Sequence, residues 1–140
     1  MGEGDYSVER QLLATRVFPT EQGRLDPAPH TPASVVDPAE VYRRWHSSKG
    51  SADDAKVEVV FGLFTDEVQG RPGPLSFDRR PAWVVFDSYT SLGRPGHSSV
   101  SAKLRSQFET PLRYRIEKAS VYDAETGEFL TGCMSATPLA

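Results

Sequence analysis

The chain has 140 residues, of which 38% are hydrophobic and 25% charged, and its formal net charge is −3. This length suits one domain with its own core and excludes two ordinary domains. The single cysteine, Cys133, excludes an internal disulfide and a cysteine-built metal cage, and no apolar run approaches the roughly 20 residues of a membrane-spanning helix.

The N-terminal stretch MGEGDYSVER is acidic and has no apolar h-region, so it does not match a signal peptide. We therefore expect either a cytoplasmic protein or an exported domain whose leader lies outside this sequence.

Charge is uneven along the chain: residues 1–70 carry 7 Lys/Arg and 12 Asp/Glu, whereas residues 71–118 carry 9 Lys/Arg and 4 Asp/Glu. Such blocks usually neutralise each other on folding, so they do not by themselves indicate an anionic partner.

The first 36 residues predict a short element and a proline-rich loop, ahead of a single domain at residues 37–140. Ser7–Phe18 places Val8, Leu12 and Leu13 at a helical spacing, and we predict a helix there, although alternate residues near its end would also suit a short strand. Five prolines and no periodicity follow in the next twenty residues. We expect residues 19–36 to form a loop that is partly mobile.

The next element is a well-marked helix. In DPAEVYRRWHSS, Asp37 can cap the free amides, Pro38 suits the first helical position and Glu40 completes a capping box. One face of this helix is apolar and carries Val41, Tyr42 and Trp45. We predict a helix over Asp37–Ser47 that packs on a sheet.

Strand patterns dominate the rest of the chain. KVEVVFGLFTDE, residues 56–67, is apolar on one face and partly apolar on the other, which is typical of a central strand. AWVVFDSYT, residues 82–90, predicts a second strand, and residues 112–134 predict two strands joined by a turn. Residues 100–109 fit a helix and a strand equally well.

This order contains no βαβ alternation. We therefore predict an α+β fold, with an antiparallel sheet of about four strands and one or two helices packed on one face. The expected core comprises the apolar helix and strand positions Trp45, Val59, Phe61, Leu63, Trp83, Val85, Ile116, Val121 and Phe129.

No motif in the sequence indicates a reaction. The three histidines, His30, His46 and His97, lack the spacing that places two ligands on one metal, and His97 with its neighbouring serines and Asp87 lacks a nucleophile turn. The glycine loops match no phosphate-binding fingerprint. Arginines alternate with apolar residues in LRYRIEK, but a solvent-facing strand has the same pattern. We expect no catalytic residue, no metal, no cofactor and no nucleic acid partner.

The segment VYDAETGEFLTG, residues 121–132, carries three acids and one glycine between two strand-like runs. A calcium loop would need acids at more fixed positions than Asp123, Glu125 and Glu128 supply. A turn accounts for each residue better. Asp123 can accept backbone hydrogen bonds at its entrance, and Gly127 can adopt the positive φ that closes a longer hairpin.

Two stretches resemble signatures of small exported domains of actinobacteria: RPAWVV at Arg80–Val85 and VYDAETGEFL at Val121–Leu130. VVFGLFTDE, at Val59–Glu67, resembles the strand that precedes them. The closing hairpin is also similar to that of PepSY-type domains, which pack a helix on an antiparallel sheet and are thought to act as inhibitory or binding modules. The resemblance covers residues 57–130 and brings no catalytic residues with it.

We therefore expect a non-enzymatic interaction domain of an exported or membrane-anchored bacterial protein, with an unknown protein or peptide partner. Its exposed partner patch would comprise Leu75, Phe77 and Trp83. The alternative is a small ligand-binding or enzymatic α+β cone of cystatin-like shape. Its pocket would be lined by Tyr42, His46 and Tyr89.

Overall fold

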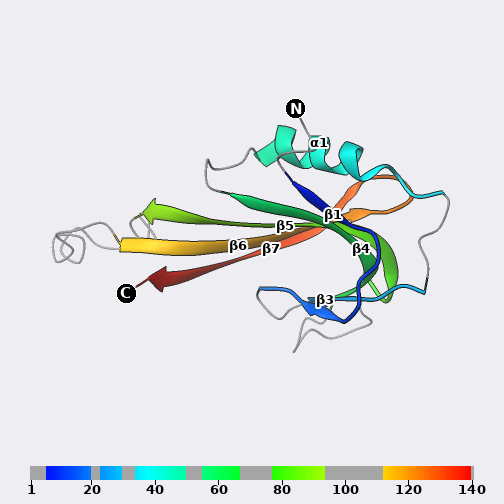
Figure 1. The fold of residues 1–140 in the computed structure, drawn as a ribbon, viewed down its shortest axis with the longest axis horizontal. Helices are drawn as coiled ribbons and strands as arrows, with labels where there is room; N and C mark the ends of the chain where they lie inside the picture. Colours follow the sequence, from blue (N-terminus) through cyan, green and yellow to red (C-terminus); the bar gives the residue numbers. More distant parts are fainter. Residues whose placement is uncertain are drawn as a thin grey trace.

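A computed structural model describes residues 6–19, 23–29, 34–49, 55–66, 77–93 and 112–139. The elements in chain order are β1 (Ser7–Glu9), β2 (Arg16–Val17), β3 (Gly23–Asp26), α1 (Pro38–Lys49), β4 (Lys56–Asp66), β5 (Arg80–Gly93), β6 (Leu112–Asp123) and β7 (Phe129–Leu139). The strands form one sheet in the order β2-β3-β4-β5-β6-β7, with β1 beside β4 (Figure 1). All pairs are antiparallel except β1 with β4.

The predicted fold class is wrong in its proportions, because the described residues contain seven strands and a single short helix. This helix is neither long nor apolar enough to cross a membrane, and no other helix occurs in the described part. The segment 100–109, which fitted both a helix and a strand, lies outside the described residues.

The helix predicted over Ser7–Phe18 is instead β1 and β2, separated by bends. The apolar residues of the predicted helix do not share one buried face, since Leu12 is buried whereas Leu13 is 94% exposed. β1 pairs with residues 58–60 of β4, and β3 pairs with residues 63–66 along the same side of β4. Satisfying the backbone groups along this side of β4 outweighs a weak helical periodicity.

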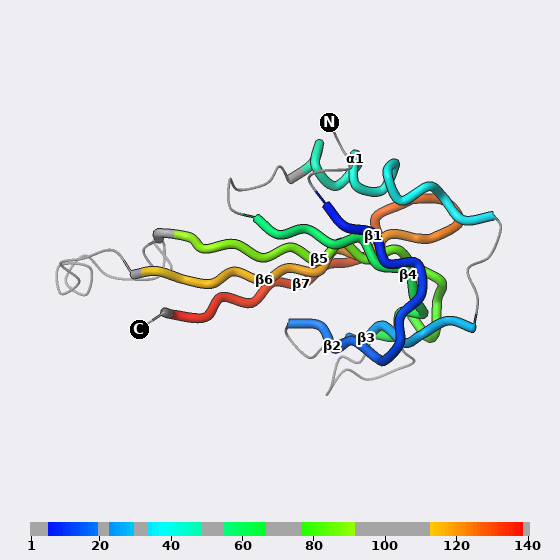
Figure 2. Tube along the Cα trace, viewed as in Figure 1, coloured from blue at the N-terminus to red at the C-terminus, as the bar shows by residue number. Residues whose placement is uncertain are grey.

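The proline-rich stretch also differs from the prediction, because it contains β3 where only a loop was expected. Leu25 of β3 is fully buried over Gly62 of β4. A Cβ at position 62 would lie 2.6 Å from Leu25 Cγ, so the missing side chain of Gly62 provides the space for Leu25. Figure 2 shows β4 bending so that β2 and β3 lie on the opposite side of the sheet from α1.

The core consists of two apolar layers, one on each face of the central strands. The layer under α1 contains Val41, Trp45, Val57, Val59, Phe61, Trp83, Val85, Tyr122 and Ala124. The opposite layer contains Leu12, Phe18, Leu25, Val60, Phe64, Ala82, Val84, Phe86, Ala119 and Val121. β4 and β5 are thus buried on both faces, which confirms the central position predicted for β4.

Two members of the predicted core differ from expectation. Phe129 is 53% exposed, and Leu63 is only half-buried. Phe129 begins β7 at the end of the strand order, whereas α1 packs over β4 and β5. A register irregularity between Val121 and Tyr122 accompanies this first pair of the β6–β7 ladder.

The helix start is confirmed. The Oδ1 atom of Asp37 accepts a hydrogen bond from the amide of Ala39 at 2.8 Å, and α1 begins at Pro38. The preceding residue, Val36, donates its amide to the carbonyl of Ala124 at 2.7 Å. Its own carbonyl accepts from Trp83 Nε1 at 2.9 Å. These bonds attach the start of the helix to the sheet.

The two buried tryptophans allow a matched test of this attachment. Trp83 donates to Val36, whereas Trp45 Nε1 is buried with no hydrogen-bond partner in the described part of the chain. Trp83→Phe leaves the Val36 carbonyl unpaired, so we expect it to lower the free energy of unfolding by about 1–3 kcal/mol more than Trp45→Phe. Urea unfolding of both variants measures the difference, and equal losses would contradict a structural role for this bond.

Candidate functional site

The predicted partner patch is not assembled as expected in the described residues. Trp83 is fully buried and belongs to the core. Phe77 is half-buried, and its ring packs on Phe64 with centroids 5.7 Å apart. Leu75 lies outside the described residues. Of these three residues, only Phe77 both lies in the described part of the chain and has a partly exposed side chain.

The residues of the predicted pocket are divided between two places. Tyr42 and His46 stack on α1 with ring centroids 5.7 Å apart, and Tyr6 stacks on Tyr42 at 4.1 Å. Tyr89 lies on β5 with the ammonium group of Lys118 5.1 Å from its ring centroid. None of the three lines either of the two cavities described below. His30 and His97 lie outside the described residues.

The larger cavity is a groove of about 600 Å³ between α1 and the β6–β7 hairpin. It is lined by Arg44, Ser48, Tyr122, Gly127, Glu128 and Phe129. α1 packs over β4 and β5 and buries Tyr122 and Ala124, but it leaves Phe129 of the hairpin exposed. The rings of Tyr122 and Phe129 meet edge to face with centroids 5.6 Å apart and form the apolar floor. Burial raises the pKa of the Tyr122 hydroxyl, opposed in part by its hydrogen bond with Ser48.

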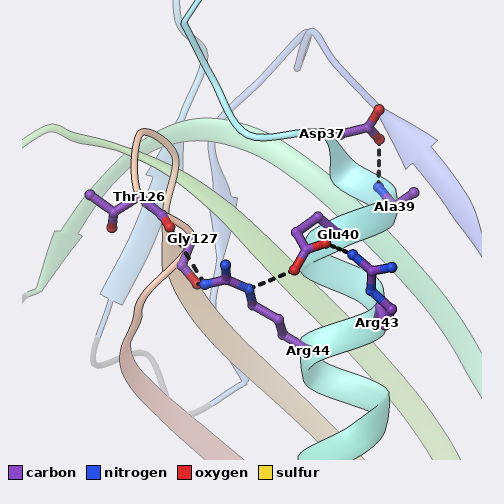
Figure 3. A network of polar contacts seen from close by, with 7 residues as sticks. All are labelled: Asp37, Ala39, Glu40, Arg43, Arg44, Thr126 and Gly127. Carbon is purple, nitrogen blue, oxygen red and sulfur yellow. Dashed lines mark hydrogen bonds and ion pairs between the residues drawn. The ribbon is translucent and has the colours of Figure 1, made fainter.

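Arg44, one of the residues that line this groove, connects the helix to the hairpin (Figure 3). Its Nε donates to Glu40 at 2.9 Å, and its Nη1 donates to the Gly127 carbonyl at 2.9 Å. Gly127 has a φ of +77°, which confirms the predicted positive φ. A Cβ there would also lie 2.9 Å from Arg44 Nη1, so glycine serves both the turn and the contact with the helix.

The turn itself confirms the role predicted for Asp123. Its Oδ1 accepts the amides of Glu125 at 2.8 Å and Thr126 at 3.1 Å, and its Oδ2 accepts from Arg80 Nε at 2.9 Å. Glu125 and Glu128 are exposed. Among the described residues, no group of three or more His, Cys, Asp or Glu side chains could hold a metal ion.

Asp123 is almost fully buried, and its pKa is below the ordinary value for aspartate. Burial alone would raise this pKa. The hydrogen bonds from Arg80 and the two turn amides, together with the charge of Arg80, outweigh that effect.

The smaller cavity, of about 220 Å³, lies beside β2 on the opposite face and is polar. Its charged lining consists of Arg16, Lys56, Glu58, Asp87, Arg115, Glu117 and Lys118. Arg16 Nη2 lies 2.7 Å from Glu58 Oε1, and its guanidinium is centred 3.9 Å from the Phe86 ring centroid. This hydrogen bond, opposed by burial, lowers the pKa of Glu58. The lining contains four cationic and three anionic side chains, so this cavity does not present a field of one sign to a charged ligand.

The outer edge of β7 is a surface feature that was not predicted from the sequence. Among the described strands β7 ends the sheet, and its eleven residues FLTGCMSATPL contain no charged side chain. The middle of this edge, Thr131–Thr137, contains no proline and no register irregularity. Phe129 and Met134 are 53% and 58% exposed. The sequence does contain a signal for this uncharged edge, because residues 129–140 form the longest run in the chain without Asp, Glu, Lys or Arg.

The edge at the other end of the sheet is protected against pairing with a strand of another chain. β2 has two residues and β3 has four. Arg16 of β2 is paired with Glu58, and Arg24 of β3 lies 3.1 Å from Asp26. Short, charged edge strands oppose pairing with another chain. β7 has neither property.

In the described part of the chain, these features define a curled, mostly antiparallel sheet with one helix, an apolar groove and one long open edge. The chain matches no protein-family model, no curated protein and no solved structure.

The lowered pKa of Asp123 predicts a particular acid sensitivity. A carboxylate whose pKa is lower in the folded state stabilises the fold above its unfolded pKa, and this contribution is lost as pH falls through the folded pKa. We expect Asp123→Asn to cost about 1 kcal/mol near neutral pH, because Arg80 is half-exposed. The cost should shrink as the pH falls below 3.8, the ordinary aspartate pKa, and through the lower pKa of folded Asp123. Urea unfolding at a series of pH values measures both curves.

Wild type and variant should both retain some acid sensitivity, since the pKa values of Asp26 and Glu58 are also lowered. Parallel stability curves for the two proteins would contradict the role assigned to Asp123.

Proposed function

We propose that the chain is a non-enzymatic interaction domain that binds an extended polypeptide segment along the outer edge of β7. The observation that carries this proposal is the length of the edge together with its lack of charge. Alternate residues of an edge strand turn unpaired N–H and C=O groups outward. A segment added as a further strand would pair with those groups, and this mode of recognition gives affinity through the main chain.

Side chains beside the edge supply contacts for such a segment. In an added strand, successive side chains point to opposite faces of the sheet. Those on the side of α1 would meet Met134 and Phe129, which are exposed large apolar side chains in the described part of β7. Phe129 also forms part of the groove lining, so the edge leads directly into an apolar pocket. Affinity from the backbone and selectivity from the groove would thus come from one continuous surface.

The resemblance of Arg80–Val85 and Val121–Leu130 to small exported bacterial domains supports the same class of function. PepSY-type domains, to which the closing hairpin is similar, are thought to act as binding or inhibitory modules. On this proposal the domain belongs to an exported or membrane-anchored bacterial protein and binds a protein or peptide.

A labelled peptide tests strand addition directly. We expect a peptide of alternating threonine and valine to bind the full chain, measured by fluorescence anisotropy, and to slow hydrogen exchange at the β7 amides. The same peptide with a central proline cannot complete the ladder and should bind at least about fivefold more weakly. Met134→Lys should weaken binding, whereas Val17→Lys, at an exposed position on the far side of the sheet, should not. Equal binding of both peptides would contradict the proposal.

Binding of a small ligand in the groove is the second candidate, favoured by the volume of the groove and by Arg44 beside aromatic walls. This arrangement suits a molecule with an apolar body and one anionic group. We expect anilinonaphthalene sulfonate to bind with increased fluorescence, and Phe129→Ala to weaken binding about fivefold or more. Val17→Ala is the matched control, since Val17 is 60% exposed and far from the groove lining. Equal dye binding by both variants would place the ligand elsewhere.

A further inference from the structure

We propose that the segment bound along β7 is β7 of a second copy of this chain, so that two sheets join edge to edge in a symmetric dimer. This inference rests on the proposed function, because it names the partner for the same edge. It deepens that function by giving the partner a sequence, a direction and a register.

The lack of charge on β7 is what favours self-pairing. A quarter of the residues in the chain are charged, so a strand of eleven would carry about three charges on average composition, and β7 carries none. In a dimer of identical strands, every side chain faces a residue drawn from the same sequence. With no charge anywhere on β7, no register of self-pairing places like charges opposite each other.

Symmetry restricts the geometry of this pairing. Two identical strands run antiparallel when they are related by a two-fold axis perpendicular to the sheet, and one residue must then lie opposite its own copy. Overlap of the whole of β7 places its middle residue, Met134, on that axis. Thr131 then lies opposite Thr137, and Cys133 lies opposite Ser135. Threonine pairs of this kind stabilise antiparallel ladders.

Neighbouring charges do not oppose this arrangement. Lys118 of β6 pairs with Met134 in the ladder, so among the described strand residues it is the cation whose ladder position is nearest the axis. Its ammonium group lies over the Tyr89 ring of β5, on the side away from β7. Three strand spacings, about 14 Å, would separate Lys118 from its own copy. This distance exceeds the Debye length of about 8 Å at physiological ionic strength.

The size of the interface sets the expected affinity. Eleven residues from each copy are about half of the 20–30 residues per side of a standard stable interface. The exposed side chains of Met134 and Phe129 add apolar contact on the α1 side of the joined sheet. We therefore expect a dissociation constant of about 10–100 μM, at which monomer and dimer exchange with concentration.

Sedimentation of the full chain from about 1 μM to about 1 mM tests the dimer. The weight-average mass should rise from 15.5 kDa towards twice that value. Met134→Lys brings two ammonium groups together on the axis and should weaken dimerisation at least about tenfold. Val17→Lys, the matched change on the other side of the sheet, should leave it unchanged. Undiminished dimerisation of Met134→Lys would overturn the inference.

Cysteine cross-linking tests the register and does not depend on a destabilising charge. In a Cys133→Ser background, Met134→Cys places two thiols opposite each other, at the Cα separation of about 4.5–5.5 Å that a disulfide accepts. It should cross-link at least about tenfold faster than Thr131→Cys, whose copy lies six residues further along the partner strand. Equal rates at both positions would refute the register.

The two proposals fail in different ways. A chain that stays monomeric up to about 1 mM but binds the threonine–valine peptide refutes the dimer and leaves strand addition in place. A chain that does neither refutes both.

Discussion

The structure depends on the burial of β4 and β5 on both faces. Val59 and Trp83 face α1, while Val60 and Val84 face the other way, and all four are fully buried. Both faces of these strands must therefore be covered, because each valine or aromatic side chain left exposed would lower the free energy of unfolding by about 1.5–3 kcal/mol. α1 therefore has to cover one face, and the segment containing Leu12, Phe18 and Leu25 has to cover the other.

The same constraint explains why a groove and an open edge remain. A helix of twelve residues is about 18 Å long, whereas the fourteen residues of β5 extend about 46 Å. One such helix cannot cover a sheet of this length and also reach β7. Arg44 and Ser48 reach the hairpin and attach it to the helix, but Phe129 remains half-exposed beyond them. The groove is therefore the space on the long sheet that the short helix α1 leaves unfilled.

Features set by local physics could be predicted from the sequence. Asp37 caps α1, Gly127 takes a positive φ, and Asp123 accepts the amides of the turn, because each of these depends only on neighbours along the chain. β1 and β3 could not be predicted in the same way. Ser7–Glu9 and Gly23–Asp26 are too short to show a period, and their pairing with β4 makes them strands. The exposure of Phe129 likewise depends on where α1 ends relative to β7. The alternation of side chains along β7 carries no information about the position of the helix.

Folding of a single chain does not require β7 to be uncharged. Gly132, Met134, Ala136 and Pro138 are all exposed, so a lysine or glutamate at Met134 or Ala136 would leave the two core layers unchanged. Charges there would also protect the edge, as Arg16 and Arg24 do at the other end of the sheet. The core and the solubility of the monomer therefore both permit charge on β7, and solubility favours it. The proposed contact along the edge supplies a physical reason for this absence, because a strand paired along Thr131–Thr137 would suit uncharged side chains and unpaired edge backbone groups together.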